Sequence, residues 1–419
     1  MGIGACLASA AVATTVAFVP GTVGAAGSKA PITVYFVNSQ GSSTGSSSYP
    51  EVWRSAKVAA NYVNSTLHGV HGQKLKLVVC PTLSTANTAL QCANTSVSGG
   101  ADVVQIGTTT YASVAQPVYE KAGVPVTIQL GTNTANYQST DSFSFVASSL
   151  GQVTGVAEFA KAQHWKQVTL LLINVPSVTS SYADLAPAVF KKLGVGLNTV
   201  LVPPTATDMT SYIASAMASK PDAIFNVQGT ASCAQSMQAL QAIQAKVTFL
   251  AQPACNDPSV LPLVPSGVKF DVMTVNDATS KSDSDAVLYN KLMKKADPAD
   301  LSNGFTPAGF QGIMNLYAAL NAAKAPKNGF DKTSILAALR KAKNQPNFMT
   351  GGTTFTCNGT VVKGYPGACS TLLIVSGLQP NHKTFKVLGI YNKPTLLKGT
   401  TAASATATTT TTAATTPSS

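Results

Sequence analysis

Hydroxyl-rich loops are the parts of this chain best placed to do chemistry. Five such loops follow predicted β-strands, at residues 40–45, 107–111, 131–134, 177–182 and 229–232. Ligands of open α/β sheets bind at the carboxyl ends of strands, where backbone N–H groups and helix N-termini face a cleft. Each loop alone is ordinary turn chemistry. Five at equivalent positions predict a cleft that surrounds a carboxylate or an amide with neutral donors.

Residue types that catalysis would need are present but poorly placed. The four histidines are His68, His71, His164 and His382, and none follows a predicted buried strand where a base would be presented. His68 and His71 share a polar loop without an acidic or cysteine neighbour, so we interpret them as loop residues and not as metal ligands. Only 16 Asp and Glu residues occur, and several are placed as helix caps. The sequence favours a binding protein over an enzyme, with neither metal nor cofactor.

Six of the seven cysteines fall into local couples. The couples are Cys80 with Cys92, Cys233 with Cys255, and Cys357 with Cys369. Six cysteines allow fifteen pairings, so this local pairing is a prediction, supported by the single loop or helix that each couple spans. No C-x-x-C spacing occurs, which argues against a metal site, and disulfides indicate an oxidising compartment.

Composition and charge exclude several classes of protein. The 419 residues are 45% hydrophobic and 11% charged, which is typical of a folded chain long enough for two domains. The net charge is +12, but Arg54 and Arg340 are the only arginines. Nucleic-acid readers rely on clustered arginine, so we predict a solvated lysine-rich surface and no nucleic-acid partner.

The N-terminus has the pattern of an export signal. Residues 3–19 are apolar and alanine-rich, Pro20 and Gly21 follow, and the small residues 23–26 suit a cleavage site. We therefore expect a signal peptide over residues 1–26 and an extracytoplasmic protein. Cys6 ends a segment with the composition of a lipoprotein box, so a lipid anchor stays open as an alternative.

The elements that would position the loops alternate between short β-branched runs and helical segments, the pattern of a parallel sheet with crossover helices. The first half contains predicted strands at 32–37, 75–79, 102–106 and 125–129, with helices at 50–66, 86–97 and 113–121. The second contains strands at 168–173, 197–202, 223–227 and 247–250, with helices at 152–163, 182–193, 209–218 and 233–244. Two such sets predict two lobes. A TIM barrel would also have eight units, but the later chain breaks its even spacing.

The last third combines helices with a β-rich end. A strand is predicted at 270–275, helices at 286–295, 306–324 and 332–341, and β-rich segments at 353–357, 371–375 and 386–391. Asn358-Gly359 between β-branched residues predicts a hairpin turn. The Thr/Ala-rich residues 395–419 are expected to form a disordered tail.

The order of these elements resembles the leucine/isoleucine/valine-binding protein family, the type I periplasmic binding proteins of ABC transporters. Segments 41–45, 99–107, 122–126 and 352–359 carry the resemblance, which extends from about residue 32 to about residue 393. It implies an α/β fold of two Rossmann-like lobes joined by three crossovers, near 146–151, 272–276 and 344–350. The expected limits are 31–148 plus 274–346 for lobe 1 and 149–273 plus 347–394 for lobe 2.

The resemblance also implies roles for individual residues. Thr108–Thr110 match the loop that binds a ligand carboxylate, Thr132 and Asn133 match a neighbouring loop, and Tyr182 matches an aromatic residue that closes over the ligand. With the hydroxyl-rich loops, the candidate ligand-binding residues are Ser43, Thr44, Thr108, Thr109, Thr110, Tyr111, Thr132, Asn133, Tyr182, Gly229 and Thr230.

One departure bears on the ligand. Amino-acid-binding members place an acidic residue after the strand equivalent to 223–227, whereas residues 229–233 here read Gly-Thr-Ala-Ser-Cys. An unpaired buried ammonium is costly. An amide, a short carboxylic acid or an aromatic acid therefore fits at least as well as a branched-chain amino acid.

The resemblance implies a monomer that captures a small solute by closure of its lobes and presents it to a membrane permease. A sensory subunit with the same fold would instead pass closure to a receptor. A secreted hydrolase on a two-lobed α/β scaffold is the third alternative.

Overall fold

The computed structural model describes residues 29–41, 48–109 and 111–400 of the chain. The predicted signal peptide, the candidate residues Ser43, Thr44 and Thr110, and the chain beyond residue 400 lie outside the described residues.

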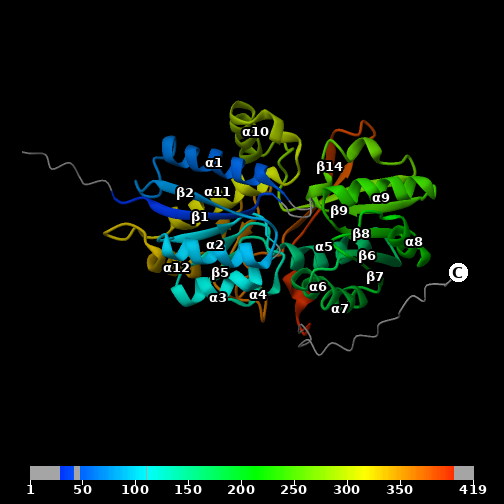
Figure 1. Ribbon diagram of the computed structural model, residues 1–419, viewed down its shortest axis with the longest axis horizontal. Coiled ribbons are helices and arrows are strands. Elements are labelled where there is room, and N and C mark those ends of the chain that lie inside the picture. Colours follow the sequence, from blue (N-terminus) through cyan, green and yellow to red (C-terminus); the bar gives the residue numbers. More distant parts are fainter. Residues whose placement is uncertain (1–28, 42–47, 110, 401–419) are drawn as a thin grey trace, which may run out of the picture.

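Two separate β-sheets organise the molecule (Figure 1). The first has the order β2-β1-β3-β4-β5 and is parallel throughout; the second has the order β14-β13-β10-β9-β8-β6-β7 and is parallel except at β13 and β14. The first sheet consists of β1 (Ile32–Ser39), β2 (Leu75–Thr82), β3 (Val103–Ile106), β4 (Val126–Ile128) and β5 (Ser142–Ser144). The second consists of β6 (Gln167–Ile173), β7 (Gly196–Val202), β8 (Ala223–Val227), β9 (Val247–Ala251), β10 (Val268–Thr274), β13 (Leu373–Leu378) and β14 (Phe385–Tyr391).

Helices cover both faces of each sheet, so each lobe has three layers (Figure 1). In the first lobe, α1 (Pro50–Ser65), α10 (Ser284–Ala296), α11 (Thr306–Ala322) and α12 (Lys332–Lys341) lie on one face. On the other face lie α2 (Ala86–Ser98) and α3 (Ala112–Ala122), with the short α4 (Thr134–Gln138) beside α3. In the second lobe, α5 (Ser148–Ala162), α6 (Pro176–Ala183) and α7 (Ala186–Lys192) oppose α8 (Thr210–Ala218) and α9 (Thr230–Ala242).

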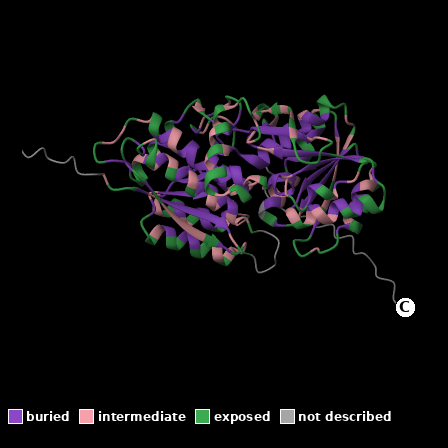
Figure 2. Ribbon diagram, turned by 90° about the horizontal axis from the view of Figure 1, so that it is seen from above, coloured by how far each residue is buried: buried purple, intermediate pink, exposed green. Residues whose placement is uncertain are grey.

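Alternation along the strands builds these layers, because successive side chains of a strand point to opposite faces. In β1, Ile32, Val34 and Phe36 join the core under α1 and α11, whereas Tyr35 and Val37 join the core under α2 and α3. Figure 2 shows the strands of both lobes as buried layers with exposed residues on the outer helix faces. The strands β3, β8 and β9 are buried along their whole length because both of their faces are covered.

The chain passes between the lobes three times, as the resemblance implied. The first crossing joins β5 to α5 and the second joins β10 to α10. The third differs from the expectation near 344–350. Phe348, Met349 and Phe355 pack in the core of the first lobe, and the chain enters the sheet of the second lobe only at β13. Residues 347–357 and Cys369, which the sequence assigned to lobe 2, therefore contribute to the core of the first lobe, whereas Val362, Tyr365 and Ala368 belong to the core of the second.

Three local predictions were wrong. The helix expected over 182–193 is divided into α6 and α7, because Pro187 lacks an N–H and fits only in a first turn. Asn358-Gly359 turns the chain but makes no hairpin; the paired strands are β11 (Gln345–Pro346) and β12 (Thr354–Phe355). The predicted tail begins too early, since the 3₁₀ helix Pro394–Leu397 buries Leu397 against the second lobe.

The three predicted disulfide pairings are confirmed. Cys80 bonds to Cys92, Cys233 to Cys255, and Cys357 to Cys369. Cys233–Cys255 links the first turn of α9 to the 3₁₀ turn Pro253–Cys255, which is separated from β9 by Gln252 alone. The remaining 3₁₀ helices are Leu261–Leu263 and Pro298–Ser302.

Candidate ligand-binding site

A cavity of about 140 Å³ lies between the two lobes, and we refer to it as the cleft. At roughly 10–15 Å³ for each water-sized group, it has room for on the order of ten such groups. From the first lobe and the crossing into α5 it is lined by Ser39, Tyr49, Thr108, Thr109, Leu130, Thr132, Ser148, Gln152 and Phe305. From the second lobe it is lined by Ile173, Val178, Tyr182, Pro203, Pro204, Val227, Gln228, Gly229, Ala231, Ser232 and Gln252.

The parallel strands place these residues together. Ser39 ends β1, Ile173 ends β6 and Val227 ends β8, while Pro203 and Gln252 each follow directly after a strand. Parallel strands end at one edge of their sheet, and the two sheets turn these edges toward each other. The cleft therefore has the location expected for ligands of open α/β sheets.

The structure brings together about half of the predicted site residues. Thr108, Thr109, Thr132, Tyr182 and Gly229 line the cleft. Thr108 is fixed by Asn38, whose Oδ1 accepts hydrogen bonds from the Thr108 backbone N–H (3.0 Å) and from its hydroxyl (2.9 Å). Their participation in ligand binding stays a prediction.

Three other predicted residues do not line the cleft. Tyr111 is the N-cap residue of α3. Asn133 caps α4, where its Oδ1 accepts the Ala135 N–H at 3.0 Å. The Thr230 hydroxyl donates to the carbonyl of Ala254 at 2.8 Å. For Asn133, capping is a local role that competes with a place in the cleft.

Sequence reasoning missed a glutamine network in the second-lobe wall of the cleft. The Tyr182 hydroxyl donates to Gln152 Oε1 at 2.6 Å, and the side chains of Gln152 and Gln252 are also hydrogen-bonded. Complete burial raises the pKa of Tyr182, so its hydroxyl remains a donor. Gln252 directly follows β9, a position that could have indicated a role, whereas Gln152 lies inside α5 without a distinguishing signal.

Two buried polar groups in the cleft wall lack a partner among the described residues. They are Gln228 Nε2, in a side chain that is 5% exposed, and Ser148 Oγ, in one that is 2% exposed. A buried polar atom without a hydrogen bond costs free energy, so such groups need an explanation. Both could donate to an oxygen of a bound ligand.

The cleft is electrically neutral. Among the described residues that line it there is no Asp, Glu, Lys, Arg or His. Four helices begin at the cleft without a side-chain cap, at Tyr49 (α1), Ala147 (α5), Gly229 (α9) and Phe305 (α11). Helix N-termini carry a partial positive charge, so the local field favours an oxygen ligand.

The lobes also contact each other beside the cleft. Thr134 of α4 and Ser181 of α6 are hydrogen-bonded, with 2.7 Å between their hydroxyl oxygens. At another edge, the Gly304 N–H donates to the carbonyl of Asn256 at 3.0 Å. We call this second contact, with its neighbours Pro253 and Asn303, the Gly304 latch. The described arrangement therefore has direct contacts between the lobes.

The described residues contain neither a group of three or more His, Cys, Asp or Glu side chains that could hold a metal ion, nor a helix long and apolar enough to cross a membrane.

Comparisons with known proteins agree with this architecture. Residues 31–368 match the family model described as periplasmic binding protein. The search of curated proteins gives no match.

Solved structures supply the closer comparisons. A leucine-binding protein of Thermotoga maritima has a TM-score of 0.68 at 16% identity, over 86% of this chain and 99% of that one. A fatty acid ABC transporter substrate-binding protein of Thermomonospora curvata has a TM-score of 0.71 at 15% identity, over 88% and 94%. An ABC transporter solute-binding protein of R. palustris, in complex with 4-hydroxybenzoate, has a TM-score of 0.68 at 14% identity, over 87% and 98%. At such identities the similarity shows a common fold.

Proposed function

The chain belongs to the periplasmic binding protein family, and we propose that it is the extracytoplasmic substrate-binding component of an ABC transporter. It captures a small solute between its lobes, and the closed form docks as a single chain on a membrane permease. The observation that carries the proposal is the cleft, whose wall is shared by the strand ends of both lobes. A ligand that contacts both lobes stabilises the closed form over the open one.

We propose a solute with a carboxylate or amide head group and an apolar body. Neutral donors and uncapped helix N-termini would hydrogen-bond the head group, and Gln228 and Ser148 are the donors in the cleft wall that lack a partner among the described residues. Tyr49, Phe305 and Pro203 supply surfaces for the apolar part. The 4-hydroxybenzoate and the fatty acid that are named for two of the similar solved structures are of this chemical type.

A zwitterionic amino acid is a poorer candidate. Its α-ammonium would be buried without a carboxylate, because the described lining residues include neither Asp nor Glu. An unpaired buried charge costs several kcal/mol, which is more than the few neutral acceptors available are expected to recover.

The hydrolase alternative has one sequence feature in its favour. Residues 41–45 have the letter pattern G-x-S-x-G of a nucleophile elbow, but such an elbow is a sharp turn directly from strand to helix. Here residues 40–49 separate β1 from α1, and no histidine is among the described lining residues. The binding role is the better supported one.

Native mass spectrometry of the freshly purified protein tests the proposal. We expect a co-purified molecule that carries a carboxylate or an amide, and calorimetry should then show binding of that molecule without turnover. A retained leucine-type amino acid would overturn the ligand class. Consumption of the added solute would overturn the binding role itself.

A further inference from the structure

A second cavity lies between the lobes, larger than the cleft and without a lining residue in common with it. Its volume is about 410 Å³, within the roughly 300–1,000 Å³ that is usual for ligand sites. Its walls come from β10, β13 and β14 of the second lobe and from α10 and the start of α11 of the first. We call it the junction cavity.

The Gly304 latch separates the junction cavity from the cleft. Gln252 and Phe305 line the cleft, whereas the adjacent residues Pro253 and Gly304 line the junction cavity. The hydrogen bond from the Gly304 N–H to the Asn256 carbonyl crosses between the lobes at this point. The two cavities therefore lie on opposite sides of a contact that exists only when the lobes are together.

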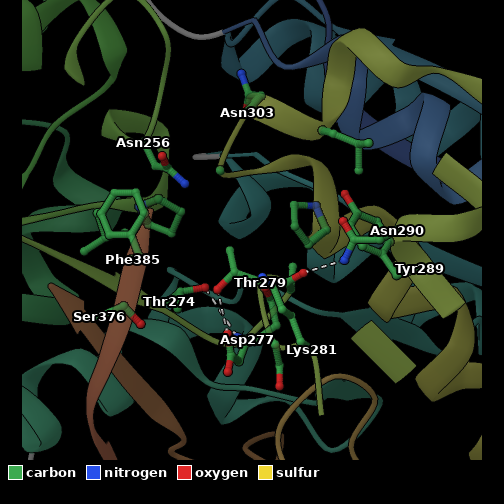
Figure 3. A pocket seen from close by; sticks show the side chains of 18 of the residues that line it. Asn256, Thr274, Asp277, Thr279, Lys281, Tyr289, Asn290, Asn303, Ser376 and Phe385 are labelled. Atoms are coloured by element: carbon green, nitrogen blue, oxygen red, sulfur yellow. Dashed lines mark hydrogen bonds between the residues drawn. The ribbon is translucent and has the colours of Figure 1, made fainter. Parts of the chain in front are cut away.

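Polar groups without partners face the junction cavity from both lobes (Figure 3). From the first lobe comes Tyr289, whose side chain is 1% exposed and whose hydroxyl has no hydrogen-bond partner among the described residues. Its ring is held edge-on against Phe310, with 5.3 Å between the ring centroids. The Asn256 side-chain amide and the Ser376 hydroxyl lie on the second-lobe side of the cavity, and neither group has a hydrogen-bond partner among the described residues.

The lining is suited to hydroxyl groups. Asn256 and several hydroxyl side chains contribute to the wall. Asn276, Asn290 and Asn303 also line it, but their side-chain N–H groups already donate within the protein. Amides and hydroxyls both donate and accept hydrogen bonds, as the hydroxyl groups of a polyol do. Phe385 offers an apolar ring face. The two charged residues, Asp277 and Lys281, lie close together on one segment and bring no net charge.

We propose that the junction cavity is a second ligand site, which binds a small uncharged polyhydroxylated molecule such as a polyol or a monosaccharide. Because both lobes form its wall, the site is complete only in this arrangement of the lobes. A molecule bound there stabilises the same arrangement that a solute in the cleft stabilises. Linkage then requires each ligand to raise the affinity for the other.

The test uses D-glucose and myo-inositol as probes of the purified full chain, followed by saturation-transfer NMR and calorimetry. We expect at least one probe to bind with millimolar or better affinity. Tyr289→Phe removes only the unpartnered hydroxyl, so we expect probe binding about fivefold weaker, the equivalent of one neutral hydrogen bond, with thermal stability retained. Asn256→Ala is the second variant and should weaken binding to a similar extent.

Gln228→Leu in the cleft is the matched control and should leave probe affinity unchanged. A Gln228→Leu variant that loses probe binding would place the probes in the cleft and overturn the proposal. Failure of both probes to bind the wild-type chain, or unchanged affinity in the Tyr289→Phe and Asn256→Ala variants, would overturn it as well.

Small-angle X-ray scattering tests the dependence on lobe arrangement. A saturating probe is expected to lower the radius of gyration of the wild-type chain, and Gly304→Ala, which pushes the lobes apart, is expected to weaken probe binding. A probe that binds Gly304→Ala as tightly as wild type would contradict a site shared by both lobes. None of these measurements needs the cleft solute, so a failure here leaves the proposed transport function untouched.

Discussion

Gly304→Ala should prevent the lobes from meeting without disturbing either lobe. A Cβ atom at Gly304 would lie 2.1 Å from the Pro253 carbonyl oxygen, and real Cβ contacts essentially never fall below 3.0 Å. Gly304 does not have a positive φ, so alanine suits its own backbone. The clash is with backbone of the opposite lobe, which no side-chain rotation can relieve.

The magnitude follows from this geometry. The segments around Gly304 and Pro253 must separate by about 0.9 Å, which lengthens the Gly304–Asn256 hydrogen bond beyond its 3.0 Å. Loss of that bond costs about 0.5–1.5 kcal/mol, and overpacking of this kind typically costs about 1–3 kcal/mol. A closed form destabilised by about 1–3 kcal/mol binds its ligand roughly 5- to 150-fold more weakly.

Calorimetry with the co-purified solute measures the affinity, and urea unfolding measures the stability. The control is Gly267→Ala, where the new Cβ would lie 2.6 Å from the Ala245 carbonyl oxygen within the second lobe. This control should lower the free energy of unfolding and leave the affinity unchanged. Wild-type affinity in Gly304→Ala, or equal loss of affinity in both variants, would refute closure at the Gly304 latch.

Three further predictions concern the pH dependence, the cleft and a disulfide. Asp271 is fully buried, and burial raises its pKa from 3.8 to about 6. The folded state therefore holds the proton more tightly than the unfolded state, which contributes on the order of 3 kcal/mol to the free energy of unfolding at low pH. This contribution is fully present below about pH 4 and is lost as the pH rises through about 6. Asp271→Asn should abolish that decline in urea unfolding, and an unchanged pH slope would contradict the assignment. Gln228→Leu should weaken binding of the cleft solute about tenfold by calorimetry while stability holds or rises, since an unpartnered donor disappears; equal affinity would remove Gln228 from the site. Replacement of Cys233 and Cys255 by alanine should cost about 3 kcal/mol of stability and should also weaken solute binding, because the bridge anchors the turn that carries Pro253; stability loss at full affinity would separate the bridge from closure.

The sequence predicted the repeated βα units because the buried strands are apolar runs separated by amphipathic helices. Pro50 and Lys332 mark helix starts to the residue. The third crossing was misplaced because residues 347–369 contain no strong periodic pattern. Their position depends on Phe348, Met349 and Phe355, which pack against a core assembled from distant segments of the chain. Local sequence patterns do not predict such packing.

The candidate site shows the same division. Positions directly after strands are visible in the sequence, and Thr108, Thr132 and Gly229 were found by this reasoning. Gln152 lies inside α5 and Phe305 precedes α11, and the orientation of both helices depends on how the lobes pack, so no local signal reveals these residues. The Gly304 latch could not be predicted either, since the sequence around a glycine in a turn does not indicate that a carbonyl of the other lobe approaches it.

The missing carboxylate after β8 and the uncapped helix N-termini have the same electrostatic consequence, because both disfavour a cation in the cleft. A cleft that held an ammonium would need an acidic side chain, and four helix N-termini pointing at the same space would oppose a cation. Those termini would instead stabilise a bound anion without a lysine or arginine, whose formal charge would cost desolvation in the closed form. A carboxylate should therefore bind more tightly than the matching amide, and the amide more tightly than the matching amine. This order follows from the backbone, so it should persist in variants of the cleft side chains.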